Sequence, residues 1–185
     1  MSKKFWVFTI GLASIFSSLS PVILAAQNKA SISYFSRSPR LINVTTTYRG
    51  ARVNRPRYYY TIDLPVGVGT PLKKITINQR QGFDEIDYYP QDTIAFQGTP
   101  HHRENSLNIE ETTWDKQTET MTIIFDPPVS PGTRFTVGLR AKKNPAYGGI
   151  YLFGVTAFPA GNNPRELYLG VGRLQFDGND DGDFD

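Results

Sequence analysis

The sequence predicts an all-β fold: an antiparallel β-sandwich of immunoglobulin-like size, with about nine short strands. Three observations support this prediction. Apolar and polar residues alternate with a period of two in many segments, no long window shows a helical period, and glycine and proline are spread along the whole chain. A closed barrel is the alternative architecture for the same pattern.

The predicted strands follow one another along most of the chain. Clear alternation predicts strands with one buried and one wet face at Ile42–Tyr48, Tyr58–Leu64, Thr120–Phe125 and Phe135–Ala141. Composition predicts further strands at Lys73–Asn78, Thr93–Phe96, Leu107–Thr112, Ile150–Phe158 and Tyr168–Phe176. Ile150–Phe158 is mostly apolar on both faces, which favours a central position in a sheet.

Proline and glycine mark the predicted turns between these strands. Asp126–Gly132 contains three prolines, so we expect neither helix nor central strand there. Its last two residues, Pro131 and Gly132, fit the centre of a type II turn. Gly161–Pro164 is a second predicted turn, and Asp84–Phe96 has room for one helical turn, interrupted by Pro90.

The first 26 residues have the composition of a signal peptide. Lys3 and Lys4 precede a short apolar run, and small residues follow, with cleavage expected after Ala25 or Ala26. The apolar run is shorter than the ~20 residues that a membrane span needs, so no stable span is expected after cleavage. We expect export to the periplasm, the outer cell surface or the medium, with one β domain at 27–176 and an acidic tail at 177–185.

Seven segments resemble a family of exported cyanobacterial proteins, domain-of-unknown-function family 2808. They are Ser38–Leu41, Tyr58–Pro65, Pro71–Gln79, Asp92–Thr99, Asp126–Thr133, Gly149–Gly161 and Tyr168–Phe176. The resemblance covers nearly the whole chain after the signal and implies an exported, β-rich protein from a cyanobacterium. It implies no activity and no functional residue. The acidic tail departs from the family pattern, so the resemblance implies nothing about it.

The sequence argues against most enzyme chemistries. It has no cysteine, so a cysteine nucleophile and a disulfide framework are excluded. The two histidines, His101 and His102, are adjacent in the polar stretch Gly98–Asn105, which we expect to be a loop. On an extended chain they point in opposite directions and cannot readily share one metal. A carboxylate-based polysaccharide hydrolase stays an alternative, because sequence cannot show how far apart two acids lie.

A basic segment between two predicted strands is the main candidate binding site. It holds four arginines within nine residues: Arg49, Arg52, Arg55 and Arg57. Clustered arginines favour an anionic partner, so we expect a non-enzymatic protein that binds an anionic polysaccharide or an envelope protein. A solvated loop that only balances nearby acids is the alternative. Nucleic acid is a poor partner, because without Lys3 and Lys4 the formal net charge of +3 falls to about +1.

A third possible role is that of a structural subunit in an outer-layer assembly. An exposed edge strand of a sandwich can join a neighbour by strand addition.

The acidic tail matches the opening of a calcium-binding loop. Asp177, Asn179 and Asp181 would supply oxygens at positions one, three and five, and Gly182 would make the turn at position six. The backbone carbonyl of Asp183 would occupy position seven. The bidentate glutamate of position twelve is missing, which weakens any such site. A solvated acidic segment is the alternative.

Overall fold

The computed structural model describes residues 31–178, and almost all of its regular structure is β-strand. The strands are β1 (Ile32–Ser33), β2 (Arg40–Thr46), β3 (Arg57–Asp63), β4 (Leu72–Gln81), β5 (Ile94–Thr99), β6 (His102–Ser106), β7 (Ile109–Asp115), β8 (Thr120–Val129), β9 (Arg134–Arg140), β10 (Gly149–Pro159), β11 (Asn163–Pro164) and β12 (Leu167–Phe176). Two short 3-10 turns, η1 (Val66–Val68) and η2 (Pro90–Asp92), complete it. No helix among the described residues is long and apolar enough to cross a membrane.

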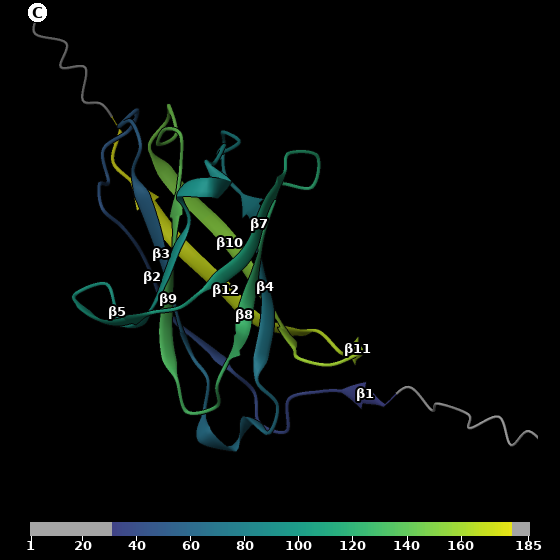
Figure 1. Cartoon of the computed structure of the whole chain (residues 1–185). Coiled ribbons are helices and arrows are strands. Elements are labelled where there is room, and N and C mark those ends of the chain that lie inside the picture. Colours follow the sequence, from purple (N-terminus) through teal and green to yellow (C-terminus); the bar gives the residue numbers. More distant parts are fainter. Residues whose placement is uncertain (1–30, 179–185) are drawn as a thin grey trace, which may run out of the picture.

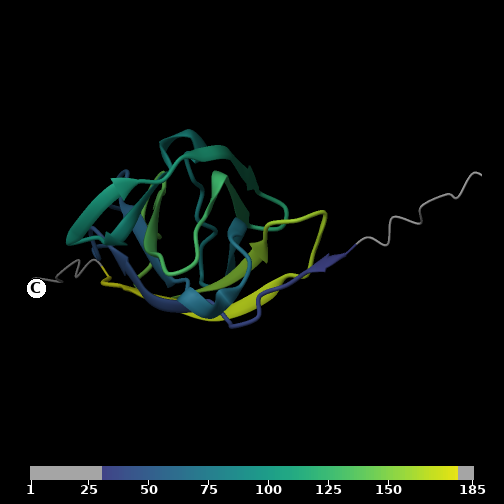
Figure 2. The same ribbon diagram turned by 60° about the horizontal axis from the view of Figure 1, so that its bottom comes forward.

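The main strands form two five-stranded antiparallel sheets that pack face to face (Figures 1 and 2). Sheet I has the order β12-β10-β4-β8-β7, and sheet II has the order β2-β3-β9-β5-β6. The predicted sandwich is confirmed, since neither sheet closes into a barrel within residues 31–178. Each of the nine predicted strands is present, and β10 lies between β12 and β4, as its two apolar faces predicted.

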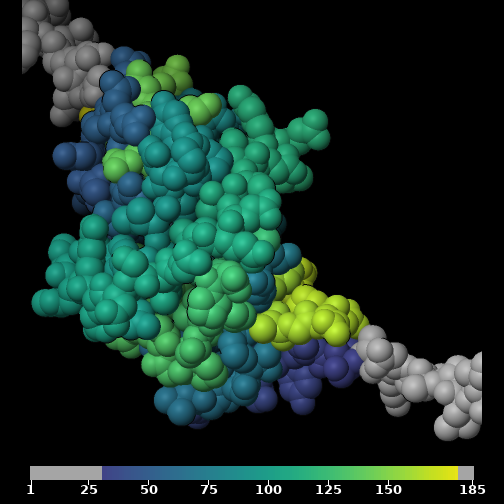
Figure 3. Space-filling view, in the orientation of Figure 1, coloured from purple at the N-terminus to yellow at the C-terminus, as the bar shows by residue number. Residues whose placement is uncertain are grey.

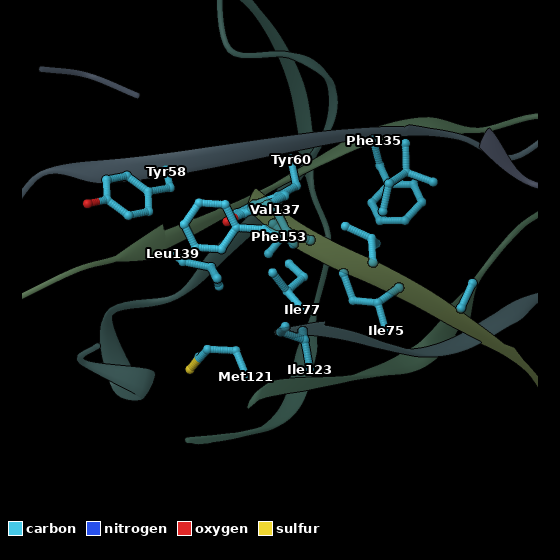
Figure 4. Packing of buried hydrophobic residues seen from close by; sticks show 14 of the residues in the cluster. Tyr58, Tyr60, Ile75, Ile77, Met121, Ile123, Phe135, Val137, Leu139 and Phe153 are labelled. Atoms are coloured by element: carbon cyan, nitrogen blue, oxygen red, sulfur yellow. The ribbon is translucent and has the colours of Figure 1, made fainter. Parts of the chain in front are cut away.

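The core lies between the sheets and is rich in aromatic rings (Figure 4). Tyr58 and Tyr60 reach into it from β3, and Phe153 meets both rings from β10 of the opposite sheet. The Tyr60 and Phe153 ring centroids are 6.1 Å apart at nearly right angles, which is a favourable edge-to-face contact. Alternation along β3 and β10 directs these rings inward, and the packed rings hold both sheets as one rigid platform.

The expected turn at Asp126–Gly132 is wrong in its first half, because β8 continues through Pro127 and Pro128 to Val129. The register with β4 shifts between Lys74, paired with Ile124, and Leu72, paired with Val129. The prolines therefore lie in a bulge where β4 needs no donor from them. The second half of the run is a turn, in which Gly132 has a φ of +81°.

Two shorter segments also differ in detail from expectation. A single 3-10 turn exists in Asp84–Phe96, but it begins at Pro90 instead of being interrupted there, because proline suits the first position of a helical turn. The predicted turn Gly161–Pro164 ends in the short strand β11, which pairs with β1 in parallel.

The predicted alternation of Ile42, Val44, Thr46 and Tyr48 fails at its first and last residues, since Tyr48 lies beyond the end of β2 and is 59 % exposed. A register shift lies between Leu41 and Asn43 in the pairing of β2 with β3. As a result Leu41 packs against the core and Ile42 is 46 % exposed. A bulge reverses the direction of the side chains on its two sides, and no sequence period reveals it.

The outer face of β3 is buried, although a wet face was predicted. Tyr59 is 7 % exposed and Thr61 is 2 % exposed. Tyr59 stacks edge-on with Phe96 of β5, and the hydroxyl groups of Thr61 and Thr136 lie 3.0 Å apart. The segment that covers this face is the β5–β6 hairpin.

Candidate binding groove

The β5–β6 hairpin is the feature that hollows the surface of sheet II. Gly98–Asn105 was expected to be a loop, but it forms the end of β5, a tight turn at Pro100 and His101, and most of β6. All of β6 is exposed, so it has no apolar face that a period-two pattern could show. In Figure 3 the hairpin forms the teal projection at the left of the molecule.

A bulge bends the hairpin toward the sheet. The register of β5 with β6 shifts between Phe96 and Gly98, and Gly98 has a φ of +88°. A Cβ atom at this position would lie only 2.1 Å from the carbonyl oxygen of His102, so only glycine fits. The hydroxyl group of Thr136 donates to the Gly98 carbonyl oxygen at 2.8 Å and ties the bend to β9.

Arg103 fixes the hairpin over the outer face of sheet II. Its guanidinium donates to the Tyr59 hydroxyl at 2.8 Å and lies 4.8 Å from the centre of the Phe96 ring. Gly138 on β9 leaves room for Tyr59, because a Cβ atom there would lie 2.9 Å from the Tyr59 ring. A cation over aromatic faces and one hydrogen bond therefore hold the hairpin in place.

Two depressions lie beside the hairpin tip. The smaller has a volume of about 300 Å³ and is lined by Ile42, Asn43, Thr45, Thr61, Thr99, Pro100, His101 and Arg134. The larger has a volume of about 550 Å³ and is lined by Asp63, Gln97, Gly98, Thr99, His102, Glu104, Gly132, Thr133 and Arg134. Both contain Thr99 and Arg134, so they adjoin one another, and we call them together the hairpin groove. His101 lines one depression and His102 the other, in agreement with the expectation that they point apart.

Charge in the hairpin groove centres on Asp63, which two arginines share. Strand register places Arg40 and Arg134 on either side of Asp63. Arg40 donates to Oδ2 at 3.2 Å, and Arg134 donates to Oδ1 from Nε at 3.2 Å and from Nη2 at 3.1 Å. Partial burial of the carboxyl acts to raise its pKa, but the hydrogen bonds and charges of both arginines outweigh this effect. The pKa of Asp63 therefore lies below its ordinary value.

The four arginines of the predicted basic site do not form one surface. Arg57 is 8 % exposed, and its Nη1 donates to the carbonyl oxygens of Asp92 and Gly138, both at 2.8 Å. Burial and the charge of Arg140 lower the pKa of Arg57. This side chain is part of the packing of β3 and β9, and the three other arginines remain exposed.

Two of these exposed arginines are paired with carboxylates. Arg55 contacts Asp92 at 2.7 Å and lies over the Tyr89 ring, and Arg49 contacts Asp177 at 3.5 Å. Arg52 makes no ion pair with any residue from 31 to 178. The observed ion pairs resemble the alternative given for this segment, a solvated loop whose arginines balance the charge of nearby carboxylates.

The predicted calcium loop lies mostly outside the described residues. Asn179, Asp181, Gly182 and Asp183 are beyond them, and only Asp177 and Gly178 can be placed. Asp177 forms a bridge with Gly50, and its amide donates to the Arg49 carbonyl oxygen at 2.8 Å. Within residues 31–178 no group of three or more His, Asp or Glu side chains is arranged to hold a metal ion.

The fold and the groove define an all-β sandwich with a recessed polar face. The chain belongs to the family described as Protein of unknown function (DUF2808), whose model matches residues 32–176. This match confirms the resemblance seen in the sequence at the level of the family. No curated protein matches the chain.

Several solved structures have a similar fold. They include the collagen-binding domain from a Staphylococcus aureus adhesin (14 % identity, TM-score 0.38, covering 66 % of this chain and 87 % of that one). Domains D2 and D3 of the major pilin SpaD from Corynebacterium diphtheriae have 14 % identity and a TM-score of 0.45, covering 72 % of this chain and 50 % of that one. The C-terminal domain of the Streptococcus agalactiae AgI/II polypeptide BspA has 15 % identity and a TM-score of 0.44, covering 75 % and 49 %. The chain thus spans about half the length of the last two, and likenesses this distant imply no ligand for it.

Sequence reasoning missed the hairpin groove. Two of its charged residues, Asp63 and Arg134, are far apart in the chain, and they meet each other and the neighbouring Arg40 only through the pairing of β2, β3 and β9. The alternation predicted for Tyr58–Leu64 places Asp63 on the outer face of that strand, which is where it lies. The strand register would have identified Arg40 and Arg134 as the partners of Asp63, but the register cannot be derived from the sequence alone.

Proposed function

We propose that this chain is a non-enzymatic, exported surface protein that binds a glycan in the hairpin groove. The observation that carries the proposal is the β5–β6 tip, which bends over the outer face of sheet II and makes two adjoining depressions, a larger one with a mainly polar lining and a smaller one with a more apolar lining. Binding sites are concave, placed on rigid elements and supplied with a few polar groups that fix orientation. Both sheets provide such a platform, and the signal-like first 26 residues support export.

The chemistry of the groove suits sugars. Its lining supplies hydroxyl groups from Thr45 and Thr99 and an amide from Asn43, which can donate and accept hydrogen bonds with sugar hydroxyls. Pro100 and His101 at the tip supply ring faces on which a sugar can stack. The groove therefore takes the place of the Arg49–Arg57 loop as the proposed glycan site, since the exposed charges of Arg49 and Arg55 are already paired.

The test is retention of the purified protein on a panel of immobilised polysaccharides, neutral and anionic. In the double variant Asn43→Ala/His101→Ala, loss of a hydrogen bond and of a stacking face should weaken binding about tenfold. The control Thr113→Ala/Asn162→Ala alters β7 of sheet I and an exposed loop, and it should bind as wild type does. If no polysaccharide retains the protein, or if both double variants bind equally, the groove is not a glycan site.

A hydrolase is a second candidate, favoured by one observation. Asp63 and Glu104 line the same depression, as a glycosidase with two carboxylates requires. Asp63 accepts from two guanidiniums and is held ionised, which does not suit a proton donor. Release of reducing ends by the wild-type protein, abolished in Glu104→Gln, would favour hydrolysis over binding alone.

A further inference from the structure

The charge of the smaller depression narrows the class of glycan. Among its lining residues Arg134 is the one Lys, Arg, Asp or Glu side chain. The rest are hydroxyl, amide, apolar and imidazole groups, and the carboxylates of Asp63 and Glu104 line the larger depression instead. Among these four residue types, Arg134 is therefore the one that a ligand in the smaller depression meets directly, although Asp63 pairs with it at 3.1 Å.

The guanidinium of Arg134 is held in one orientation and keeps donors to spare. Its Nε and Nη2 both donate to Oδ1 of Asp63, while its Nη1 makes no hydrogen bond with any residue from 31 to 178. Its side chain is 51 % exposed, so a ligand can reach it. A guanidinium is planar and has five donors, and the pairing of one edge with Asp63 fixes the direction of the others.

Asp63 does not neutralise this site. Its other oxygen, Oδ2, accepts from Arg40, so one carboxylate serves two guanidiniums. The cluster of Arg40, Asp63 and Arg134 thus keeps one formal positive charge. An anionic ligand group would balance that charge and form a charge-assisted hydrogen bond, which is stronger than a neutral one.

We propose that the smaller depression takes a sugar that carries an anionic group, either a carboxylate or a sulfate, and that the group is bound by Nη1 of Arg134. Asn43, Thr45 and Thr99 would bind the hydroxyl groups of the same sugar. This inference rests on the proposed function, because it specifies the ligand of the hairpin groove.

The experiment is a calorimetric titration of the purified protein with matched oligosaccharides. They are an oligouronate, its neutral methyl ester, and a neutral oligosaccharide of the same length with and without sulfate groups. We expect the oligouronate or the sulfated sugar to bind tenfold or more tightly than its neutral counterpart, and the acid that binds identifies the anionic group. In Arg134→Gln this preference should vanish, so that the charged sugar binds no more tightly than its neutral counterpart.

Two further variants make the test specific. Arg173→Gln removes an exposed arginine from β12 of sheet I and should keep the preference. Arg134→Lys retains the positive charge but lacks the planar guanidinium, so it should keep only part of the preference for charged sugars. Thermal unfolding of each variant verifies that it is folded.

The outcomes separate the two proposals. Equal affinity for charged and neutral sugars, or an unchanged preference in Arg134→Gln, overturns the inference and leaves glycan binding intact. If the preference for charged sugars is lost in Arg173→Gln, the anionic group binds on sheet I, and the inference about Arg134 is overturned as well. Absence of binding to every sugar rejects both the inference and the proposed function.

Discussion

Asp63 shows how one residue links stability to the proposed site. Its carboxylate accepts from Arg40 and Arg134 and is more buried than either partner, with 18 % of its side chain exposed against 68 % and 51 %. The two arginines lower its pKa because they favour the charged form. A group with a lowered pKa in the folded state stabilises the fold above its unfolded pKa. That stabilisation is lost as the pH falls through the folded pKa.

Asp63→Asn should therefore destabilise the protein in a pH-dependent way. At pH 7 we expect a loss of about 1 kcal/mol, because both guanidiniums are largely solvated. The difference from wild type should shrink as the pH falls below the ordinary aspartate value of about 4 toward the lowered pKa of Asp63. Urea unfolding at pH 7 and at a series of acid pH values measures it. A difference that stays constant over the whole series would contradict the role given to the two arginines.

At the scale of elements, Asn144 joins two loops at one end of the sandwich. Its Nδ2 donates to the carbonyl oxygens of Tyr48 and Gly50, at 2.9 Å and 2.7 Å. Its Oδ1 accepts from the buried Tyr58 hydroxyl at 2.8 Å. The amide is 2 % exposed, so these three bonds connect the β2–β3 loop, the β9–β10 loop and the core in place of water.

Asn144→Ala should cost about 3 kcal/mol of unfolding free energy, since the change leaves a buried hydroxyl and two carbonyls without this partner. Urea unfolding followed by tyrosine and tryptophan fluorescence measures the loss. Asn162→Ala, at an exposed position, serves as the matched control and should change stability by less than about 0.5 kcal/mol. Equal small losses in both variants would show that the loops are held by other contacts.

The elements also show how far the sequence predicts this fold and where it fails. Composition located five of the nine longest strands, and period-two alternation located the other four, because burial of one face imposes that pattern. It could not find β6, whose residues are all exposed, and it ended β8 too early because Pro127 and Pro128 occupy a bulge. Both strand segments are defined by their pairing with a neighbouring strand, and the sequence of a single segment does not show that pairing.

The candidate site was less predictable for a related reason. Clustering along the sequence singled out Arg57, but strand register turns it onto the outer face of β3, where Gly138 of β9 makes room for its side chain. By contrast, Asp63 and Arg134, which line the groove, and Arg40, which pairs with Asp63, come from three different strands. A charge run in the sequence indicates neither which side chains will be buried nor which distant residues will join them.

At the scale of the whole molecule, the two sheets meet along one side, where β2 and β12 run past each other. Gly172 of β12 lies against Val44 of β2, and a Cβ atom at this glycine would be 2.3 Å from Val44 Cγ2. The edges of both sheets are therefore shielded on this side. Of the edge strands of the two five-stranded sheets, β6 and β7 are the ones left for a structural subunit that joins neighbours by strand addition.

Gly172→Ala should destabilise the protein by about 1–3 kcal/mol, because an added methyl group overlaps Val44 and forces the edges apart. Thermal or urea unfolding measures the effect. Gly67→Ala is the control, since its nearest contact, to the Arg37 side chain, would be 3.8 Å away. The double variant Gly172→Ala/Val44→Ala should recover part of the loss. If Gly172→Ala is as stable as wild type, β2 and β12 can move apart without a cost in unfolding free energy.

The described chain starts and finishes at opposite ends of the sandwich: β1 lies at one end, and the C-terminal end of β12 lies at the other (Figure 1). Tension applied between these points would act along β12 and not across it. This strand pairs with β10 along its whole length, with one register shift between Val155 and Thr156, and antiparallel hydrogen bonds stand perpendicular to their strands. Most of the load on β12 would therefore act on this ladder in shear, and we expect the domain to resist extension between these two points.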